Sequence, residues 1–317
     1  MQLTTNTRSF IEAEQYSSFI LKALHDGMLS ESFYRPITDF SNGDTLHIKT
    51  VGTVTLQEAA EDTELVYNPI ESGEITFRLT EYPGDAWYVT DDLREDGSQV
   101  EALMAARSME STRAFQEKFE TDVLAAAAEV YPNADPYTVN GFAHKIVSSE
   151  TNGTLQLDDI IAMRLAFDKA KVPAAGRILL VDPTADATLN QFISLTSNIT
   201  PFAEEILKQG VSSGMQFRFN LYGFDIIKST RLYGTTDADD GTNSITGPVT
   251  YNLAMCIADD QTKPLMAAIR RTPKVEGERN KDKARDEFVV RGRYGVGVQR
   301  MDTLGTIVTH ATNWKPA

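Results

Sequence analysis

Apolar residues near the N-terminus follow a helical period. Those between Tyr16 and Leu24 recur three or four residues apart, behind a capping-box signature at Ser9 and Glu12. Gly27 supplies a stop signal. The pattern predicts one amphipathic helix. The sequence leaves open whether this helix packs on its own core or, as an arm, on a neighbouring molecule.

From residue 42 onward the apolar period changes to two. Apolar and polar residues alternate in Leu46–Lys49 and again in Ile75–Leu79, which predicts two half-exposed strands. The polar stretch Gln57–Glu74 separates them, and residues 44–79 carry seven acidic and two basic residues, a net charge of −5. So long an insert favours an extended, solvated or partner-facing arm over a compact hairpin. A disordered loop is the alternative.

The stretch Gln99–Tyr131 predicts one long helix. A capping box at Ser98 and Glu101 precedes it, and apolar residues continue at four-residue steps from Phe115. Such a helix would be about 50 Å long and, with one apolar stripe, would brace a sheet along its length. A coiled coil is the competitor, but the heptad pattern is not sustained.

The middle of the chain mixes helix and strand. A helix is predicted from Leu157, with acidic residues in its first turn and lysines in its last, and Pro173 ends it. The apolar run Arg177–Val181 predicts a buried strand, and Pro183 begins a further helix. The composition of Tyr233–Gly247 predicts a flexible acidic loop.

The last section predicts a returning sheet. Strands are expected at Leu265–Thr272, Glu287–Gln299 and Thr306–His310, with a charged loop at Pro273–Asp286. We expect these strands to rejoin the layer that the long helix braces.

Composition narrows the class of protein. A length of 317 residues with 41% apolar and 24% charged content predicts one large or two modest globular domains. The single cysteine, Cys256, lies in an apolar run and is expected to be buried. No membrane-length apolar run and no secretory signal is visible, which predicts folding in a cytoplasm. The net charge of −15 argues against direct binding of nucleic acid.

Catalytic motifs are missing from the sequence. It has no G-x-S-x-G elbow and no phosphate-binding loop, and the G-x-G at Gly295 and Gly297 lacks a third glycine and a following helix. The histidines are far apart and never at a metal-ligand spacing; they are His25, His47, His144 and His310. We therefore predict no catalytic residue, no cofactor and no metal site, and expect surface or structural histidines.

Three stretches carry a family resemblance: Val172–Pro183, Leu221–Leu232 and Glu287–His310. With the order of elements described above, the chain resembles the major capsid proteins of tailed bacteriophages, the HK ninety-seven type. The resemblance implies an α+β fold with an N-terminal arm, an extended β-hairpin loop, a peripheral domain with a long spine helix, and an axial domain.

The resemblance also implies a division of the chain. Residues 1–40 would form the N-terminal arm, 41–90 the extended loop and 91–135 the peripheral domain with its spine helix. Residues 136–263 would form the axial domain, and 264–317 the return strands of the peripheral domain and the C-terminus.

The function implied by the resemblance is assembly. A major capsid protein would associate with itself into pentamers and hexamers of an icosahedral shell in the virion, assembled in the host bacterial cytoplasm without a membrane. The shell would enclose double-stranded DNA without sequence-specific binding. Because the chain begins with Met1 almost at its arm, a separate scaffolding protein is expected, with a portal and in some members a decoration protein. An encapsulin-like cargo shell of the same fold and, less favoured, a soluble α/β enzyme remain as alternatives.

Charge predicts which surfaces meet between subunits. An acidic run in the extended loop and a basic run near the C-terminus are expected to pair; they are Glu58, Glu61, Asp62 and Glu64 on one side and Arg279, Lys281, Lys283 and Arg285 on the other.

Overall fold

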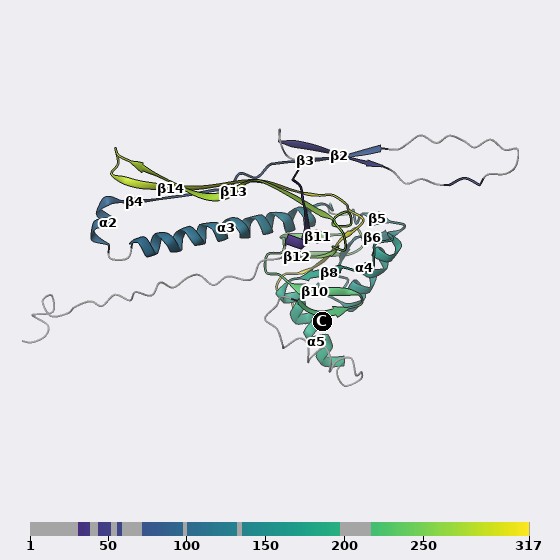
Figure 1. The fold of residues 1–317 in the computed structure, drawn as a ribbon. Coiled ribbons are helices and arrows are strands. Elements are labelled where there is room, and N and C mark those ends of the chain that lie inside the picture. The colour runs from purple at the N-terminus through teal and green to yellow at the C-terminus, as the bar shows by residue number, and fades with distance from the viewer. Residues whose placement is uncertain are drawn as a thin grey trace, which may run out of the picture.

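A long helix and a narrow sheet extend side by side from an α/β body (Figure 1). The computed structural model describes residues 31–38, 44–51, 56–58, 72–97, 100–131, 135–196 and 217–316. The predicted N-terminal helix around Ser9–Gly27 lies outside these residues. The mixture of helices and strands confirms the predicted α+β class. None of the described helices combines the length and the apolar character that crossing a membrane requires.

The body is built on a seven-stranded sheet. Its order is β7 (Lys145–Val147), β15 (Leu304–His310), β12 (Ser244–Cys256), β8 (Arg177–Val181), β10 (Phe224–Lys228) and β9 (Phe217–Leu221), with β11 (Gly234–Asp239) paired to β12. The central strand β12 runs antiparallel to both β8 and β15, whereas β10 is parallel to β8 and β7 is parallel to β15.

Both faces of this sheet are covered, which explains the uninterrupted apolar run of β8. Ile178 and Leu180 face a core shared with the C-terminal half of the long helix, whereas Leu179 and Val181 face α4 (Leu157–Lys169) and α5 (Pro183–Thr196). A strand that is buried on both faces has no solvent side and therefore needs no polar alternation. The predicted helices at Leu157 and Pro183 are confirmed.

The second sheet lies along the predicted long helix. Its order is β1 (Tyr34–Pro36), β13 (Leu265–Asn280), β14 (Arg285–Val298) and β4 (Gly84–Thr90), preceded by a 3-10 turn at Glu31–Phe33 and followed by α2 (Asp91–Asp96). The long helix is α3 (Val100–Glu129), which confirms the prediction to within two residues at each end.

Aromatic residues join α3 to this sheet. The Phe119 ring meets Tyr34 and Tyr294 edge to face, with centroid distances of 5.5 and 5.1 Å. The Tyr294 hydroxyl donates a hydrogen bond of 2.6 Å to Asp122 of the helix. Phe115 packs against Gly292, where an added Cβ would lie 3.2 Å from the ring. The helix therefore braces the sheet, as its apolar stripe predicts.

The charged segment Pro273–Asp286 is not the predicted loop. β13 continues to Asn280 and β14 begins at Arg285, so only four residues form the turn. Val275 pairs with the fully buried Val290, and the period of two thus persists beneath the charged residues. The many charged residues of this segment therefore lie on a solvent-exposed face of the hairpin and do not mark a break between its strands.

The last strand also differs from expectation. β13 and β14 lie beside α3, but β15 joins the seven-stranded sheet between β7 and β12. Its alternate residues face both cores of the body, with Val308 toward α3 and Ile307 toward α4. Because β15 is buried on both sides, its apolar run fits the central part of the body better than a half-exposed sheet.

The two strands that flank the acidic insert pair as predicted. β2 (Thr45–Val51) and β3 (Ser72–Arg78) run antiparallel in a continuous register from Thr45–Arg78 to Val51–Ser72. The base of this stem packs on the four-stranded sheet through Phe77 and Leu79. We refer to β2 and β3 together as the stem.

The predicted flexible loop Tyr233–Gly247 is instead a hairpin of β11 and β12. Its carboxylates accept backbone hydrogen bonds: Asp240 from the amides of Val147, Thr242 and Asn243 at 2.7–2.8 Å, and Asp237 from Gly247 at 3.0 Å. The acidic residues thus cap the turn, which composition alone did not indicate. A further two-stranded ribbon, β5 (Thr138–Val139) with β6 (Phe142–Ala143), lies near α4.

Candidate interaction surfaces

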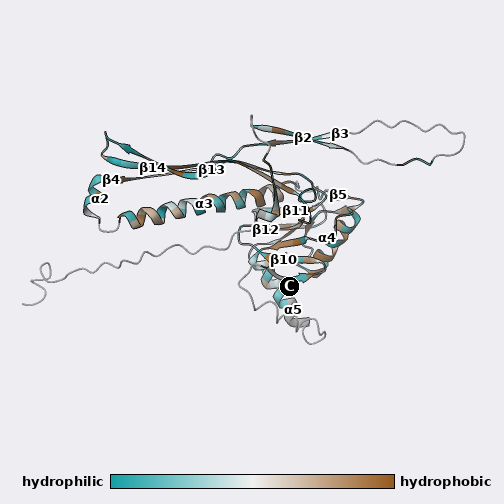
Figure 2. Ribbon diagram, viewed as in Figure 1, coloured by the Kyte–Doolittle hydropathy of each residue, from teal (hydrophilic) through white to brown (hydrophobic). Residues whose placement is uncertain are grey.

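The basic run predicted to contact another subunit lies at the tip of the β13–β14 hairpin. Arg279 holds Asp91 of α2 with two hydrogen bonds of 2.5 and 2.6 Å, and it also reaches Asp286 at 3.2 Å. Arg94 completes this network with a 2.6 Å contact to Asp286. In Figure 2 this end of the molecule is largely hydrophilic.

Arg285 is occupied in a similar way. Its guanidinium lies 2.6–2.7 Å from Glu287 and stacks over the Tyr88 ring at 4.4 Å. The hydrogen bonds from Arg285 and Asn280 lower the pKa of Glu287, and the hydrogen bonds from Arg279 lower the pKa of Asp91. Two of the four predicted cations therefore stabilise their own subunit.

The remaining two are the lysines of the turn. Lys281 and Lys283 are exposed and make no ion pair within the described residues. Asp282 stands between them. The tip thus offers a weaker basic surface than the sequence implied.

Of the predicted acidic run, only Glu58 lies within the described residues, where it is exposed. Glu61, Asp62 and Glu64 lie outside them. The described residues therefore bring no acidic member of the run to the hairpin tip of the same chain.

A second basic surface, which was not predicted from the sequence, lies on the outer face of the four-stranded sheet. Arg271 stands directly opposite Arg293, and Lys274 directly opposite Arg291, so that four cations occupy neighbouring cross-strand pairs. We call these residues the basic rungs. Among the residues that the structure describes, none of them forms an ion pair. The signal was the alternation in "RGR", which places both arginines on one face of a strand.

Like charges directly opposite each other in a sheet are destabilising. Arg293 offsets part of this cost by lying 4.8 Å from the centroid of the exposed Tyr82 ring, but its buried Nε has no hydrogen-bond partner in the part of the chain that the structure describes. Glu276 is the next outward-facing residue of β13, and it makes no ion pair with Lys274 or Arg291 within the described part of the chain.

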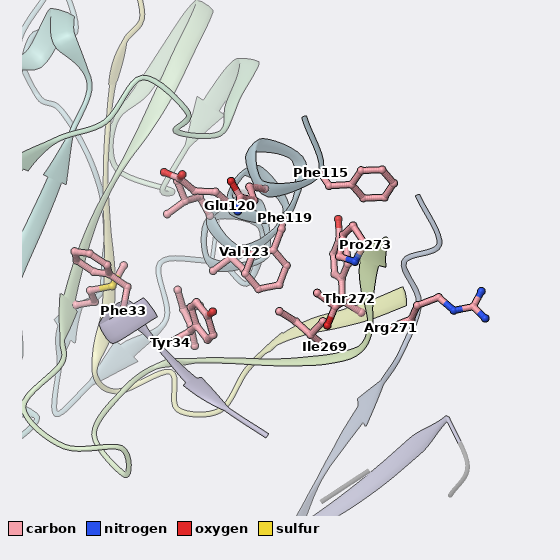
Figure 3. Close-up of a pocket in the computed structure, with 15 residues that line it drawn as sticks. Phe33, Tyr34, Phe115, Phe119, Glu120, Val123, Ile269, Arg271, Thr272 and Pro273 are labelled. Atoms are coloured by element: carbon pink, nitrogen blue, oxygen red, sulfur yellow. The ribbon is translucent and has the colours of Figure 1, made fainter. Parts of the chain in front are cut away.

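An apolar groove of about 410 Å³ lies on the opposite, helix-facing side of β13 (Figure 3). Phe119 and Val123 of α3 form one wall, and Ile269 and Pro273 of β13 form the other. Figure 3 shows Arg271 extending away from this groove, in keeping with its place among the basic rungs. Ile269 is 52% exposed at the rim, so the groove is open to solvent.

Two titratable groups, His144 and Cys256, are packed inside the body. His144 is fully buried between the Tyr137 and Phe167 rings, and burial lowers its pKa. Cys256 is buried, as predicted. No cluster of three or more metal-ligating side chains occurs among the described residues.

Comparisons with known proteins agree with this geometry. Residues 73–309 match the family described as phage capsid protein. A search of curated proteins found no match.

Solved capsid structures share the fold over almost the whole chain. A Mycobacterium phage Che8 chain is 18% identical with a TM-score of 0.64, and the match covers 96% of this chain and 98% of that one. The capsid of cyanophage P-SCSP1u is 17% identical with a TM-score of 0.65, covering 96% and 94% of the two chains.

An encapsulin of Synechococcus elongatus is less similar, at 12% identity and a TM-score of 0.59 over 99% and 98% of the chains. The likeness to all three shows the HK ninety-seven-type fold, which the sequence resemblance implied. Because the family match spans well over half of its residues, this chain belongs to the phage capsid protein family.

Proposed function

We propose that this chain is the major subunit of a tailed-bacteriophage shell, in which copies associate into pentamers and hexamers of an icosahedral capsid around double-stranded DNA. The family match over residues 73–309 carries the proposal. The role is structural, and no catalytic step is assigned to any residue.

The shape of the chain supports self-association. The outer half of α3 leaves Leu103 and Met109 55% and 63% exposed, and the apolar groove beside β13 is open. Exposed apolar surface of this kind is typical of interaction sites. The helix, the hairpin and the stem project from the body, so neighbouring chains could cover these residues (Figure 1).

The finer assignments belong to the same proposal. A scaffolding protein would guide assembly, a portal would occupy one vertex, and a decoration protein would bind the finished shell. Assembly would take place in the cytoplasm of the host bacterium. The net charge of −15 supports a shell that encloses DNA without binding it directly. Residues 136–263 would form the axial domain, between the spine helix and the return strands of the peripheral domain.

Opposite charges would help to fix the register of neighbouring subunits. The acidic run of the insert would face a basic surface of the next subunit. The turn lysines Lys281 and Lys283 are the part of the predicted basic run that remains available for this contact.

The proposal is tested by expressing the chain with and without the neighbouring phage genes. We expect rings or megadalton shells in size-exclusion chromatography with light scattering and in negative-stain microscopy. A stable monomer under both conditions would contradict the proposal. Native particles then separate the two kinds of shell, because a capsid protects double-stranded DNA from nuclease whereas an encapsulin-like shell retains an enzyme cargo.

A further inference from the structure

We infer that His310 acts as a pH-sensitive clasp for the C-terminal segment, residues 311–316. The neutral ring holds this segment on the body, and a protonated ring loosens it. The inference stands apart from the proposed function, because every group that it uses belongs to one chain. The sequence predicted only a surface or structural position for this histidine.

The ring of His310 lies where β15 ends and the C-terminal segment begins. The backbone amides of Thr312 and Asn313 both point at its Nδ1, at 3.2 and 3.3 Å, and the Thr312 hydroxyl lies 3.2 Å from the same atom. Two N–H groups that point at one ring nitrogen require that nitrogen to be an acceptor. The geometry therefore places the proton of the neutral ring on Nε2 and makes Nδ1 the cap of the turn that starts the segment.

The carbonyl side of the segment is held by side chains that do not titrate. Three side chains of the body donate to its carbonyl oxygens: Thr184 to Ala311 at 2.7 Å, Thr188 to Trp314 at 2.9 Å and Asn152 to Lys315 at 3.2 Å. Hydroxyl and amide groups of this kind stay neutral between pH 5 and pH 8. The bonds to Nδ1 are thus the ones, among the described residues, whose acceptor changes state in this range.

Protonation of the ring removes this acceptor. An imidazolium carries an N–H on both nitrogens, so Nδ1 can no longer accept from Thr312 and Asn313. Its charge and its new hydrogen would then face two amide hydrogens, and these amides regain hydrogen bonds only if the segment moves into water. Because only the neutral ring makes the contact, the held state is favoured at high pH and is lost as the pH falls. Histidine side chains in general change charge between about pH 7 and pH 5.

No ion pair fixes the charge of the His310 ring within the described part of the chain. The turn at Gly153 accepts a hydrogen bond from its backbone amide, and at Gly247 of β12 an added Cβ would lie 3.3 Å from Nε2. The charged residues of the segments around the ring are Glu150, Asp182, Asp186, Asp237, Asp239 and Lys315. Glu150 and Asp237 already accept backbone hydrogen bonds of 2.9 and 3.0 Å from the amides of Asn152 and Gly247.

The segment carries one of the two tryptophans of the chain. Trp314 is 45% exposed, and the Lys315 ammonium lies 4.8 Å from the centroid of its ring. Loosening the segment would change these surroundings and free the hydroxyl of Thr188 on α5. The other tryptophan is Trp87 of β4, in the four-stranded sheet. Once Trp87 is replaced, tryptophan fluorescence therefore reports on the segment alone.

Fluorescence of Trp314 tests the clasp. The chain carrying Trp87→Phe is titrated from pH 8 to pH 5, and quenching of its emission by acrylamide is measured. We expect the quenching constant to rise about twofold, with a midpoint between pH 7 and pH 5. Far-UV circular dichroism recorded on the same samples separates a local opening from unfolding of the body.

Two variants in this background separate the acceptor from the charge. The Oδ1 of Asn can take the place of Nδ1 without titrating, so His310→Asn should keep low quenching at both pH values. His310→Ala, which has no acceptor, should show high quenching at both. His144→Phe is the matched control, since it removes a histidine that is buried in the body and should leave the response of Trp314 unchanged.

A rise of equal size in His310→Asn, or no rise in the chain with His310, would overturn the inference. A rise that disappears in His144→Phe would assign the response to the body and would overturn it as well. If His310→Ala does not fold, the comparison with His310→Asn decides alone. None of these outcomes depends on whether copies of the chain assemble.

Discussion

Arg279 and Asp91 are 188 residues apart in sequence and form a two-pronged ion pair at the outer end of the four-stranded sheet. The pair ties the turn of the β13–β14 hairpin to the first residue of α2. Backbone pairing reinforces it, because the amide of Asp91 donates to the carbonyl of Ala284 at 3.1 Å. The hairpin tip and α2 therefore form one hydrogen-bonded unit.

Replacing Arg279 with Ala should loosen this unit without unfolding the chain. Hydrogen exchange should accelerate in residues 91–97 and 281–286, because Asp91 and Asp286 both lose a partner. The midpoint of thermal unfolding should hardly change, since exposed ion pairs contribute little to global stability. Lys281→Ala, in the same turn, should leave exchange unaltered; acceleration of equal size there would show that the ion pair is not the cause.

Gly295→Ala should destabilise the contact between the stem and the sheet. An added Cβ would lie 2.3 Å from the carbonyl oxygen of Arg78 and 3.0 Å from the Cα of Leu79, both backbone atoms that cannot rotate away. We expect a loss of roughly 1–3 kcal/mol in the free energy of unfolding, the usual cost of overpacking. Gly84→Ala is the control, because its nearest contact would be 3.6 Å. Chemical denaturation compares the two, and similar losses would contradict the packing argument.

The buried His144 predicts loss of stability in mild acid. Burial lowers its pKa below the ordinary value of 6.5, although the nearby Asp302 acts in the opposite direction. The unfolded chain therefore binds a proton more readily, and stability falls as the pH drops below about 6.5, by at most about 1.4 kcal/mol per pH unit.

His144→Phe should flatten this dependence, because a phenyl ring can stack between Tyr137 and Phe167 without titrating. Denaturant midpoints measured between pH 8 and pH 5 test it. A variant that follows the same pH curve as the unmodified protein would rule out His144 as the source.

Tyr131 fastens the end of α3 to the body. Its buried hydroxyl donates to the carbonyl of Leu304 at 2.7 Å and lies 3.0 Å from that of Met301. Tyr131→Phe leaves these carbonyls without this donor, and we expect a loss of about 1–2 kcal/mol in the free energy of unfolding. Tyr137→Phe, which removes a half-buried bond to Asp302, should cost less. The reverse order in thermal unfolding would contradict this ranking.

The sequence predicted the elements whose apolar residues repeat without interruption. The start of α4 and the apolar run of β8 follow directly from such repeats. Gln99–Tyr131 likewise forms α3, because apolar residues recur every four positions from Phe115 through Phe119 and Val123 to Ala127.

The errors fall where charge was taken as a sign of a loop. Both Pro273–Asp286 and Tyr233–Gly247 form hairpins, because strand pairing needs only one apolar face and tolerates any side chain on the other. The sequence also could not predict which sheet a strand joins. No local feature of Thr306–His310 indicates that β15 pairs with β12 rather than with β14.

The predicted basic run at the hairpin tip could likewise not be fully assessed from local sequence. The sequence identified which residues are charged but not which already have partners, since Arg279 meets Asp91 only after β4, α2 and β13 converge. To predict the basic rungs, one would need to know the register of β14 against β13, including its irregularities near Arg271.

The way α3 is anchored has a mechanical consequence. Its last two turns are buried, with Leu124, Ala127 and Ala128 all at most 2% exposed, while Leu103 and Met109 near its start stand in solvent. With its 30 residues the helix is about 45 Å long, and together with the sheet that it braces it projects from the body. A rotation of about 5° at the base of this projection would move its outer end by roughly 4 Å, given that length. A small change in the packing of the body would therefore displace α2 and the hairpin tip by a much larger distance.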